Sequence, residues 1–276
     1  MIYRTVNLKD EFPTLEKDVF LTSYCPDNSR DIDPLRKRKT VLVLPGGSYA
    51  FVSEREGEPV ALAFCGNDVN AFLLHYNVGD LHAPYPFIEG FAAIAYLRHH
   101  AEEYHVDPDG IAVMGFSAGG HFAGSLGAFC RKKEYADYLG VPLADILVNG
   151  VLLGYPVILM ENQPSAGTND NLLRNNPEKR IEYSLDKQVT EDYPPTFLWT
   201  TNDDKLVPSF HSLQFALALR EKGVEFEFHY YPHGEHGSSL ARPSVYGPNT
   251  DPAVLKNLSY ISNWFSHALR FIQEIL

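Results

Sequence analysis

Short apolar runs alternate with longer helical patterns along most of the chain, and this alternation limits the fold more than any other feature. The run TVLVLPG at 40–46 is rich in β-branched residues and ends in Pro-Gly, which is typical of a buried strand. Similar runs predict strands at the start of the chain and at 19–25, 69–77, 111–116, 149–157, 196–201 and 224–231. Strands that alternate with helices form a parallel sheet covered on both faces. The chain is therefore predicted to be an α/β protein with a mostly parallel sheet.

The intervals between these runs carry helical patterns, with one exception. Helices are predicted at 53–67, 86–105, 117–130, 208–223 and 254–276. The run at 224–231 alternates apolar and polar residues, as a half-exposed edge strand does. The exception is 160–193, which is polar, rich in Asn and Pro, and without a clear period. Because an insertion this long is typically a lid or a binding loop, we expect a single domain over 1–276 with a cap at 160–193. Asn171, Leu172 and Leu173 of this cap are expected to cover the site.

Composition excludes several classes of protein. Apolar residues make up 45% of the 276 residues, enough to bury a core, and the net charge of −12 would repel a nucleic acid backbone. The longest apolar run, 150–160, is too short to span a membrane, and no basic start followed by an apolar stretch marks a secretory signal. The three cysteines form no CxxC pair, so neither a disulfide framework nor a structural zinc site is expected. We therefore expect a soluble, cytoplasmic protein with reduced cysteines.

A candidate nucleophile lies where one predicted strand meets the next helix. Residues 115–119 read Gly-Phe-Ser-Ala-Gly, which fits the pattern G-x-S-x-G. A strand that leads directly into a helix forces a tight turn at the serine, and small neighbours let the backbone pack closely while the hydroxyl projects above the sheet. Ser117 is therefore the candidate nucleophile. The alternative is a glycine-rich packing turn with an incidental serine.

Acid and base candidates follow Ser117 in the chain. A serine hydroxyl needs a base to act as a nucleophile, and the base needs an orienting acid. Asp203 and Asp204 follow the next-to-last predicted strand, and His233 and His236 follow the last one. Each pair lies just past the carboxyl end of its strand, where open α/β sheets place their ligands. The residues alone leave the choice within each pair open.

Acyl transfer also needs backbone donors for the oxyanion that forms on the substrate. One candidate is the N–H of Ala118, at the start of the helix after the serine. The other is the loop after the strand at 40–46, where Gly47, with Ser48 next to it, lets the backbone approach a substrate. The alternative is that the glycines there only form a loop.

Several neighbouring residues have weaker assignments. Four candidates could line a substrate pocket, with a core or rim position as the alternative: Gly46, Tyr49, Phe51 and Tyr155. His121 is expected to pack in the core, and Glu54 and Glu56 open a predicted helix, where they favour the helix dipole without a catalytic role. No set of histidines with metal-ligand spacing is identified, so no metal site is expected.

The motifs together carry a family resemblance. The stretches LPGGSYAFVSEREGEPVALAF, IAVMGFSAGGHFA, PPTFLWTTNDDKLVP and YPHGEHG resemble the acetyl esterase and feruloyl/acetyl esterase branch of the α/β-hydrolase superfamily, which is related to carboxylesterases of the hormone-sensitive-lipase type. The resemblance covers roughly residues 40–240, with the motifs in the family's order. The Pro-Gly-Gly-Ser of this chain departs from the His-Gly-Gly-Gly of the hormone-sensitive-lipase group and is closer to the form of the acetyl esterase branch.

The resemblance implies an α/β-hydrolase fold, with a twisted, mostly parallel, eight-stranded sheet, helices on both faces and a small cap. It implies hydrolysis of small acyl esters, such as acetylated sugars or aryl esters, without a cofactor. It also implies which member of each pair acts. The family's acid lies in an Asp-x-x-Val-Pro pattern, which falls on Asp204, and its histidine position corresponds to His236, which Gly237 follows.

Two rival functions remain open at this point. One keeps the fold and the three side chains but acts as a serine peptidase or an acyltransferase. The other is a catalytically dead hydrolase-fold protein that only binds a partner. The natural ester is undetermined, and a homo-oligomer through the edge strand at 224–231 or the last helix is an open alternative.

Overall fold

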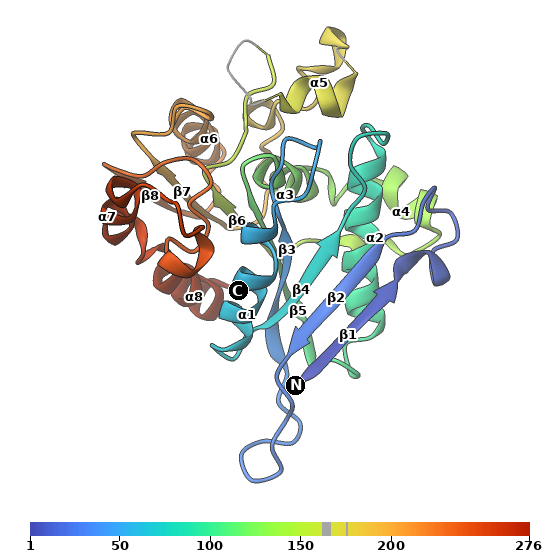
Figure 1. Ribbon diagram of the computed structural model, residues 1–276. Helices are drawn as coiled ribbons and strands as arrows, with labels where there is room; N and C mark the ends of the chain where they lie inside the picture. Colours follow the sequence, from blue (N-terminus) through green and yellow to red (C-terminus); the bar gives the residue numbers. More distant parts are fainter. Residues whose placement is uncertain (162–166, 175) are drawn as a thin grey trace.

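The computed structural model describes residues 1–161, 167–174 and 176–276, and its centre is an eight-stranded sheet (Figure 1). The strands are β1 Ile2–Asn7, β2 Phe20–Cys25, β3 Arg38–Leu44, β4 Asn70–His75, β5 Val106–Phe116, β6 Gly150–Gly154, β7 Thr196–Thr201 and β8 Phe226–Tyr231. Their order across the sheet is β1-β2-β4-β3-β5-β6-β7-β8. Among the strands of the described residues, only the β1–β2 and β2–β4 pairings are antiparallel, so the prediction of a mostly parallel sheet is confirmed.

Helices cover both faces of the sheet (Figure 1). They are α1 Glu58–Cys65, α2 Tyr85–His99, α3 Ala118–Phe129, α4 Lys133–Leu139, α5 Thr168–Leu173, α6 Phe210–Glu221, α7 Pro252–Ile261 and α8 Trp264–Ile275. Short 3-10 turns occur at Leu8–Asp10, Glu54–Glu56, Leu143–Ile146, Pro177–Lys179, Leu185–Lys187 and Pro243–Val245. One hydrophobic cluster holds Leu42 of β3 with side chains of α2, α3 and α6, and the other holds Val41 with side chains of α1, α7 and α8. This division follows from the alternation of side chains along a strand.

Two predicted helices differ from the structure. The helix predicted at 254–276 is two helices, because α7 ends before Ser262 and α8 begins after Asn263, and such short polar side chains favour helix ends over helix interiors. The helix predicted at 53–67 begins as a 3-10 turn and becomes α-helical only after Gly57. The predicted edge strand is confirmed, because β8 closes one side of the sheet.

The segment predicted as a cap connects β6 to β7 and has two different parts. Residues 162–166 and 175 lie outside the described residues. From Tyr183 to Tyr193 the segment contributes buried side chains to the core on the α3 side of the sheet. The helix α5 lies beside the loops at the carboxyl ends of the strands, where Asn171 Nδ2 donates to the carbonyl of Ser48 at 2.7 Å. Much of the predicted insertion is therefore core, and its role as a cap over substrate stays a prediction.

No helix among the described residues is long and apolar enough to cross a membrane. All three cysteines are free. The cytoplasmic location and the homo-oligomer remain predictions.

Candidate active site

The backbone at Ser117 has the sharp turn that the sequence predicts. Ser117 joins β5 to α3 with φ 53° and ψ −122°, a backbone conformation that residues other than glycine rarely adopt. A Cβ on Gly115 would lie 1.9 Å from the carbonyl oxygen of Gly119, and one on Gly119 would lie 2.1 Å from that of Leu44. Only glycine therefore fits on either side of the serine, and the G-x-S-x-G pattern is a packing requirement of this turn.

Ser117 is the first member of a hydrogen-bonded chain of three side chains. Ser117 Oγ lies 2.8 Å from His236 Nε2, and His236 Nδ1 lies 2.7 Å from Asp204 Oδ2. A carboxylate can only accept, so Nδ1 carries the proton and Nε2 is left to accept from the serine hydroxyl. The backbone N–H groups of Leu206 and Val207 both donate to Asp204 Oδ1 at 2.9 Å, which fixes the fully buried carboxylate. The arrangement can withdraw a proton from Ser117 and stabilise the imidazolium that forms.

The three side chains meet because they follow parallel strands of one sheet, whose carboxyl ends lie at the same edge. Ser117 follows β5, Asp204 follows β7, and His236 follows β8. The turn that carries His236 is fixed to the end of β7, because Thr201 Oγ1 donates to the carbonyl of Gly234 at 2.7 Å. Gly234 has φ 148°, which a residue with a side chain would not adopt without strain.

A second histidine–aspartate pair lies beside the first but faces solvent. His233 Nδ1 lies 2.9 Å from Asp203 Oδ2, and the two side chains are 48% and 41% exposed. The ring of His233 packs against Tyr260. The structure therefore separates the two pairs that the residues alone left open: one reaches Ser117, and the other forms a surface contact.

The predicted oxyanion donors lie on two sides of Ser117. Ala118 is the first residue of α3, so its N–H has no partner within the helix. Gly47 and Ser48 have φ 128° and 57°, and a Cβ built on the preceding Gly46 would lie 3.0 Å from Ser117 Cβ. The turn is therefore in direct contact with the serine. Among the described residues, no acceptor is bonded to the N–H of Gly47.

Residues 36–219, well over half of the chain, match the sequence profile of the family described as BD-FAE. The chain belongs to the BD-FAE family. Among curated relatives, this BD-FAE chain is 37% identical to endo-1,4-beta-xylanase B of Butyrivibrio fibrisolvens over 222 residues, which are 76% of the chain and 34% of the relative. It is 28% identical to an acetylxylan esterase of Xylanibacter ruminicola over 210 residues, 72% of the chain and 41% of the relative. The chain thus spans less than half the length of these two relatives.

Solved structures resemble the BD-FAE chain over nearly its whole length. The acetyl ester-xyloside bifunctional hydrolase from Caldicellulosiruptor lactoaceticus has a TM-score of 0.82 and 30% identity, and the match covers 99% of this chain and 96% of that one. A carboxylesterase from Lactobacillus plantarum has a TM-score of 0.83 and 26% identity with the same coverage. The predicted α/β-hydrolase fold and the resemblance to the acetyl esterase branch are both confirmed.

Of the predicted pocket residues, only one exposes a large side chain. Phe51 is 60% exposed beside the turn at Gly47. Tyr49 and Tyr155 are each 1% exposed, and their hydroxyls bond to His121 Nδ1 and to Glu56. The expectation that Tyr49 and Tyr155 line the pocket is corrected, because both side chains are buried and support neighbouring groups instead. Gly46 offers only backbone, and its N–H is already bonded.

His121 packs in the core, as expected. It is fully buried, and its Nε2 lies 2.8 Å from the carbonyl of Tyr183 in the segment between β6 and β7. Burial lowers the pKa of its imidazole to about 4, so the ring is neutral at physiological pH. With Tyr49 on Nδ1, the ring links α3 to the loop after β3 and to the predicted cap segment.

Glu56 is buried beside the site, whereas Glu54 of the same turn is exposed. The sequence predicts Glu56 as a helix-start acid that needs no catalytic role, and in the structure its side chain is 2% exposed. Gly46 N donates to Oε2 at 2.8 Å, and Tyr155 Oη donates to Oε1 at 2.6 Å. No periodicity in the sequence distinguishes Glu56 from the exposed Glu54 two residues earlier. The burial of Glu56 could therefore not be predicted from the sequence alone.

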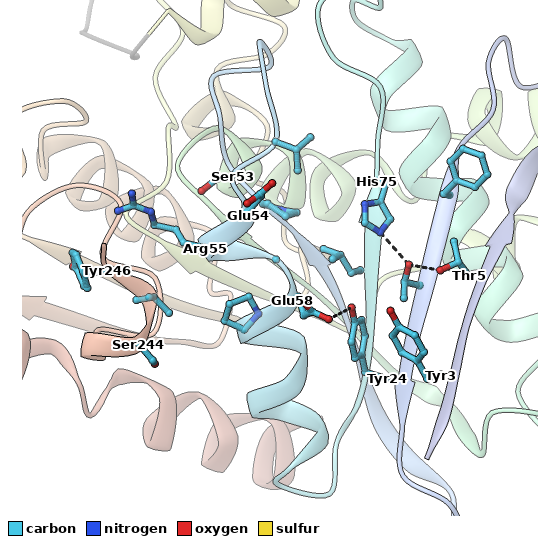
Figure 2. Close-up of a pocket in the computed structure, with 18 residues that line it drawn as sticks. Tyr3, Thr5, Tyr24, Ser53, Glu54, Arg55, Glu58, His75, Ser244 and Tyr246 are labelled. Carbon is cyan, nitrogen blue, oxygen red and sulfur yellow. Dashed lines mark hydrogen bonds between the residues drawn. The ribbon is translucent and has the colours of Figure 1, made fainter. Parts of the chain in front are cut away.

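A surface cavity of about 1110 Å³ lies beside the Glu54–Glu56 turn, with Ser53, Glu54 and Arg55 among its lining residues (Figure 2). It is lined by side chains of β1, β2 and β4, by the start of α1, and by residues near Tyr246. Within it, Tyr24 Oη donates to Glu58 at 3.2 Å, and Thr22 Oγ1 lies 3.0 Å from His75 Nε2. Pro45 and Ser53 connect this cavity to the turn beside Ser117, but none of the three hydrogen-bonded side chains lines it.

One group of side chains in the described residues could present metal ligands. Ligand atoms of Glu227, His229 and His267 lie within 4.8 Å of one another on β8 and α8. Glu227 Oε1 is already bonded to His229 at 2.6 Å and to Arg270 at 2.7 Å. The guanidinium neutralises the carboxylate that a cation would need, so we interpret the group as an ion-pair network.

Proposed function

We propose that this chain is a serine carboxylesterase that hydrolyses short-chain acyl esters through an acyl-enzyme. The observation that carries the proposal is the unbroken hydrogen-bond chain from Ser117 through His236 to the buried Asp204, at 2.8 and 2.7 Å. Its members follow three strands of one sheet, in the order that α/β-hydrolases use. The alternative pair, His233 and Asp203, has no contact with the serine.

In the proposed reaction, Ser117 Oγ attacks the ester carbonyl carbon while His236 Nε2 takes its proton. The carbonyl oxygen becomes an oxyanion, and the imidazolium then gives its proton to the leaving alcohol as the C–O bond breaks. A water molecule, deprotonated by His236, attacks the acyl-enzyme, and the released acid and a free Ser117 complete the cycle. Asp204 holds the imidazole in the tautomer that accepts from serine and stabilises its positive form.

The N–H groups of Gly47 and Ala118 are the proposed oxyanion donors, with Ser48 as the neighbour that shapes the turn. Donors that are held in place before the reaction need no reorganisation when charge develops, and each is worth about 10²–10³ in rate. In support, Gly47 and Ser48 have positive φ angles, and a Cβ on the preceding Gly46 would lie 3.0 Å from Ser117 Cβ. Phe51, exposed beside the turn, is the proposed contact for the substrate.

The proposed substrates are acetyl-type esters of sugars, with xylan acetates first. Support comes from the acetylxylan esterase and the xylanase among the relatives, and from the acetyl ester-xyloside hydrolase among the structures. These names describe the other proteins. The exposed side of the site is consistent with a bulky alcohol, because Phe51 and the cavity beside Ser53 both face solvent.

The test is a chain-length series of p-nitrophenyl esters, run beside acetylated xylan and sugar acetates, with Ser117→Ala as the matched control. We expect turnover to be highest for acetate and to disappear in the variant. A parallel set of p-nitroanilide substrates separates an esterase from a peptidase, and added alcohol acceptors reveal an acyltransferase. Absence of nitrophenol release above the uncatalysed rate in the wild type would instead favour a binding protein without catalysis.

A further inference from the structure

Glu56 is a carboxylate buried between the two halves of the site, and nothing in the proposed reaction uses it. We propose that Glu56 is a positioning residue that fixes the oxyanion turn and the His236 loop relative to each other. The inference rests on the proposed function and adds one residue to its machinery. A carbon built on Gly46 would lie 2.8 Å from Glu56 Oε2 and 3.0 Å from Ser117 Cβ, so the carboxylate and the nucleophile border the same point.

On one side, Glu56 fixes the direction of the proposed donor. Its Oε2 accepts from the N–H of Gly46 at 2.8 Å, and the carbonyl of Gly46 accepts from the N–H of Ser53 at 2.9 Å. In a trans peptide the carbonyl of Gly46 and the N–H of Gly47 point in opposite directions. Holding both polar groups of Gly46 therefore determines where the Gly47 N–H points.

On the other side, Glu56 fixes the surroundings of the base through Tyr155. The hydroxyl of Tyr155 donates to Oε1 at 2.6 Å and accepts from the N–H of Ser239 at 2.9 Å. The ring of Tyr155 lies edge-on against the imidazole of His236, with 5.0 Å between ring centres. One phenol thus contacts His236 directly and holds the chain three residues beyond it.

The carboxylate is suited to this place because it only accepts hydrogen bonds. Among the described residues no cation forms an ion pair with Glu56, so its two neutral donors offset a burial that is otherwise unfavourable. Burial and the Glu56 charge raise the pKa of Tyr155 well above its usual value, which keeps its hydroxyl a donor. A glutamine at 56 keeps the shape, but its amide group can accept from only one of the two donors.

The experiment compares Glu56→Gln with Tyr155→Phe, and with Glu54→Gln as the matched control from the same turn. Steady-state kcat and KM for p-nitrophenyl acetate are normalised to active sites counted from the nitrophenol burst, and melting temperatures are recorded beside them. We expect Glu56→Gln to lower kcat about 10²-fold with KM within threefold, since small misplacements of reacting groups cost about this much. Tyr155→Phe keeps Gly46 fixed and should lose less, and Glu54→Gln should match the wild type.

The double variant provides a second test that does not depend on the stability of one protein. If Glu56 acts on His236 through Tyr155, the double variant should lose less activity than the product of the two single losses. A folded Glu56→Gln protein whose kcat per active site stays within threefold of wild type overturns the inference, even if its melting temperature falls. Failure of the proposed function gives a different result, because the Ser117→Ala variant would then hydrolyse the ester as the wild type does.

Discussion

The two histidines of YPHGEHG provide a matched pair for testing which imidazole is the base. His236 lies 2.8 Å from Ser117 Oγ, and its side chain is 15% exposed. His233 is 48% exposed and reaches only Asp203. Replacing each in turn by alanine removes the same chemical group from the same loop, so non-specific effects on the loop are matched.

From the structure we expect very different losses of activity for the two alanine variants. His236→Ala removes the only side chain among the described residues that is bonded to Ser117 Oγ, so deprotonation of the serine is lost. Removing one member of such a unit costs about 10⁴–10⁶ in kcat. His233→Ala removes one exposed pair, and such pairs contribute little, so kcat/KM should change by less than about fivefold.

The assay is hydrolysis of p-nitrophenyl acetate with burst titration of active sites. His236→Ala should show no burst, and adding Ser117→Ala should cause no further loss, because the members act as a unit. The reverse ranking of the two histidines, or additive losses in the Ser117/His236 double variant, would refute the reasoning.

Three further predictions follow from single contacts. Asp204→Asn should lower kcat about 10⁴-fold, because the amide no longer holds His236 in the tautomer that accepts from serine. Asp203→Asn should leave kcat within about fivefold of wild type, and steady-state assays of both variants test this difference. Gly47→Ala should abolish most esterase activity or soluble expression, because its Cβ would lie 2.0 Å from the carbonyl oxygen of Phe51; activity near wild type would contradict the turn geometry. Glu89 of α2 is 2% exposed, and this burial raises the pKa of its carboxyl group from about 4.5 to about 7. The folded state therefore binds more protons than the unfolded state between these two pH values. The free energy of unfolding should therefore fall with rising pH across this window, by about 3 kcal/mol, and urea titrations should show this slope reduced in Glu89→Gln.

Much of the fold could be predicted because each element has a local cause. The β-branched run of β3 and the alternation in β8 mark strands by themselves, and the glycines at 115 and 119 mark the turn at Ser117. The two C-terminal helices were predicted as one because the apolar pattern continues across the break. Only the polar pair Ser262–Asn263 indicates that break, and such pairs also occur within continuous helices.

The site was predictable only where backbone position and chemistry coincide. Ser117 and the loops after the last two strands could be placed from chain order alone. The choice of His236 needed a family resemblance, because which of two nearby imidazoles faces the serine depends on three-dimensional loop geometry. Glu56 could not be found at all, because its partners Gly46 and Tyr155 come from loops far apart in the sequence.

The sequence likewise provides no indication that part of the segment between β6 and β7 packs in the core. Its polar composition suggested a cap, yet Tyr183 and Leu185 are buried against α3. A polar stretch with a few well-placed apolar residues gives no periodic signal, because irregular backbone has no fixed spacing between its inward-facing side chains.

The most direct test of the central claim is to locate the nucleophile. Wild-type protein treated with a fluorophosphonate probe, digested and analysed by mass spectrometry should carry one adduct, on Ser117. Labelling should disappear in His236→Ala, whose serine lacks a base, and should persist in His233→Ala. An adduct on another residue, or ester hydrolysis that continues in Ser117→Ala, would contradict the account.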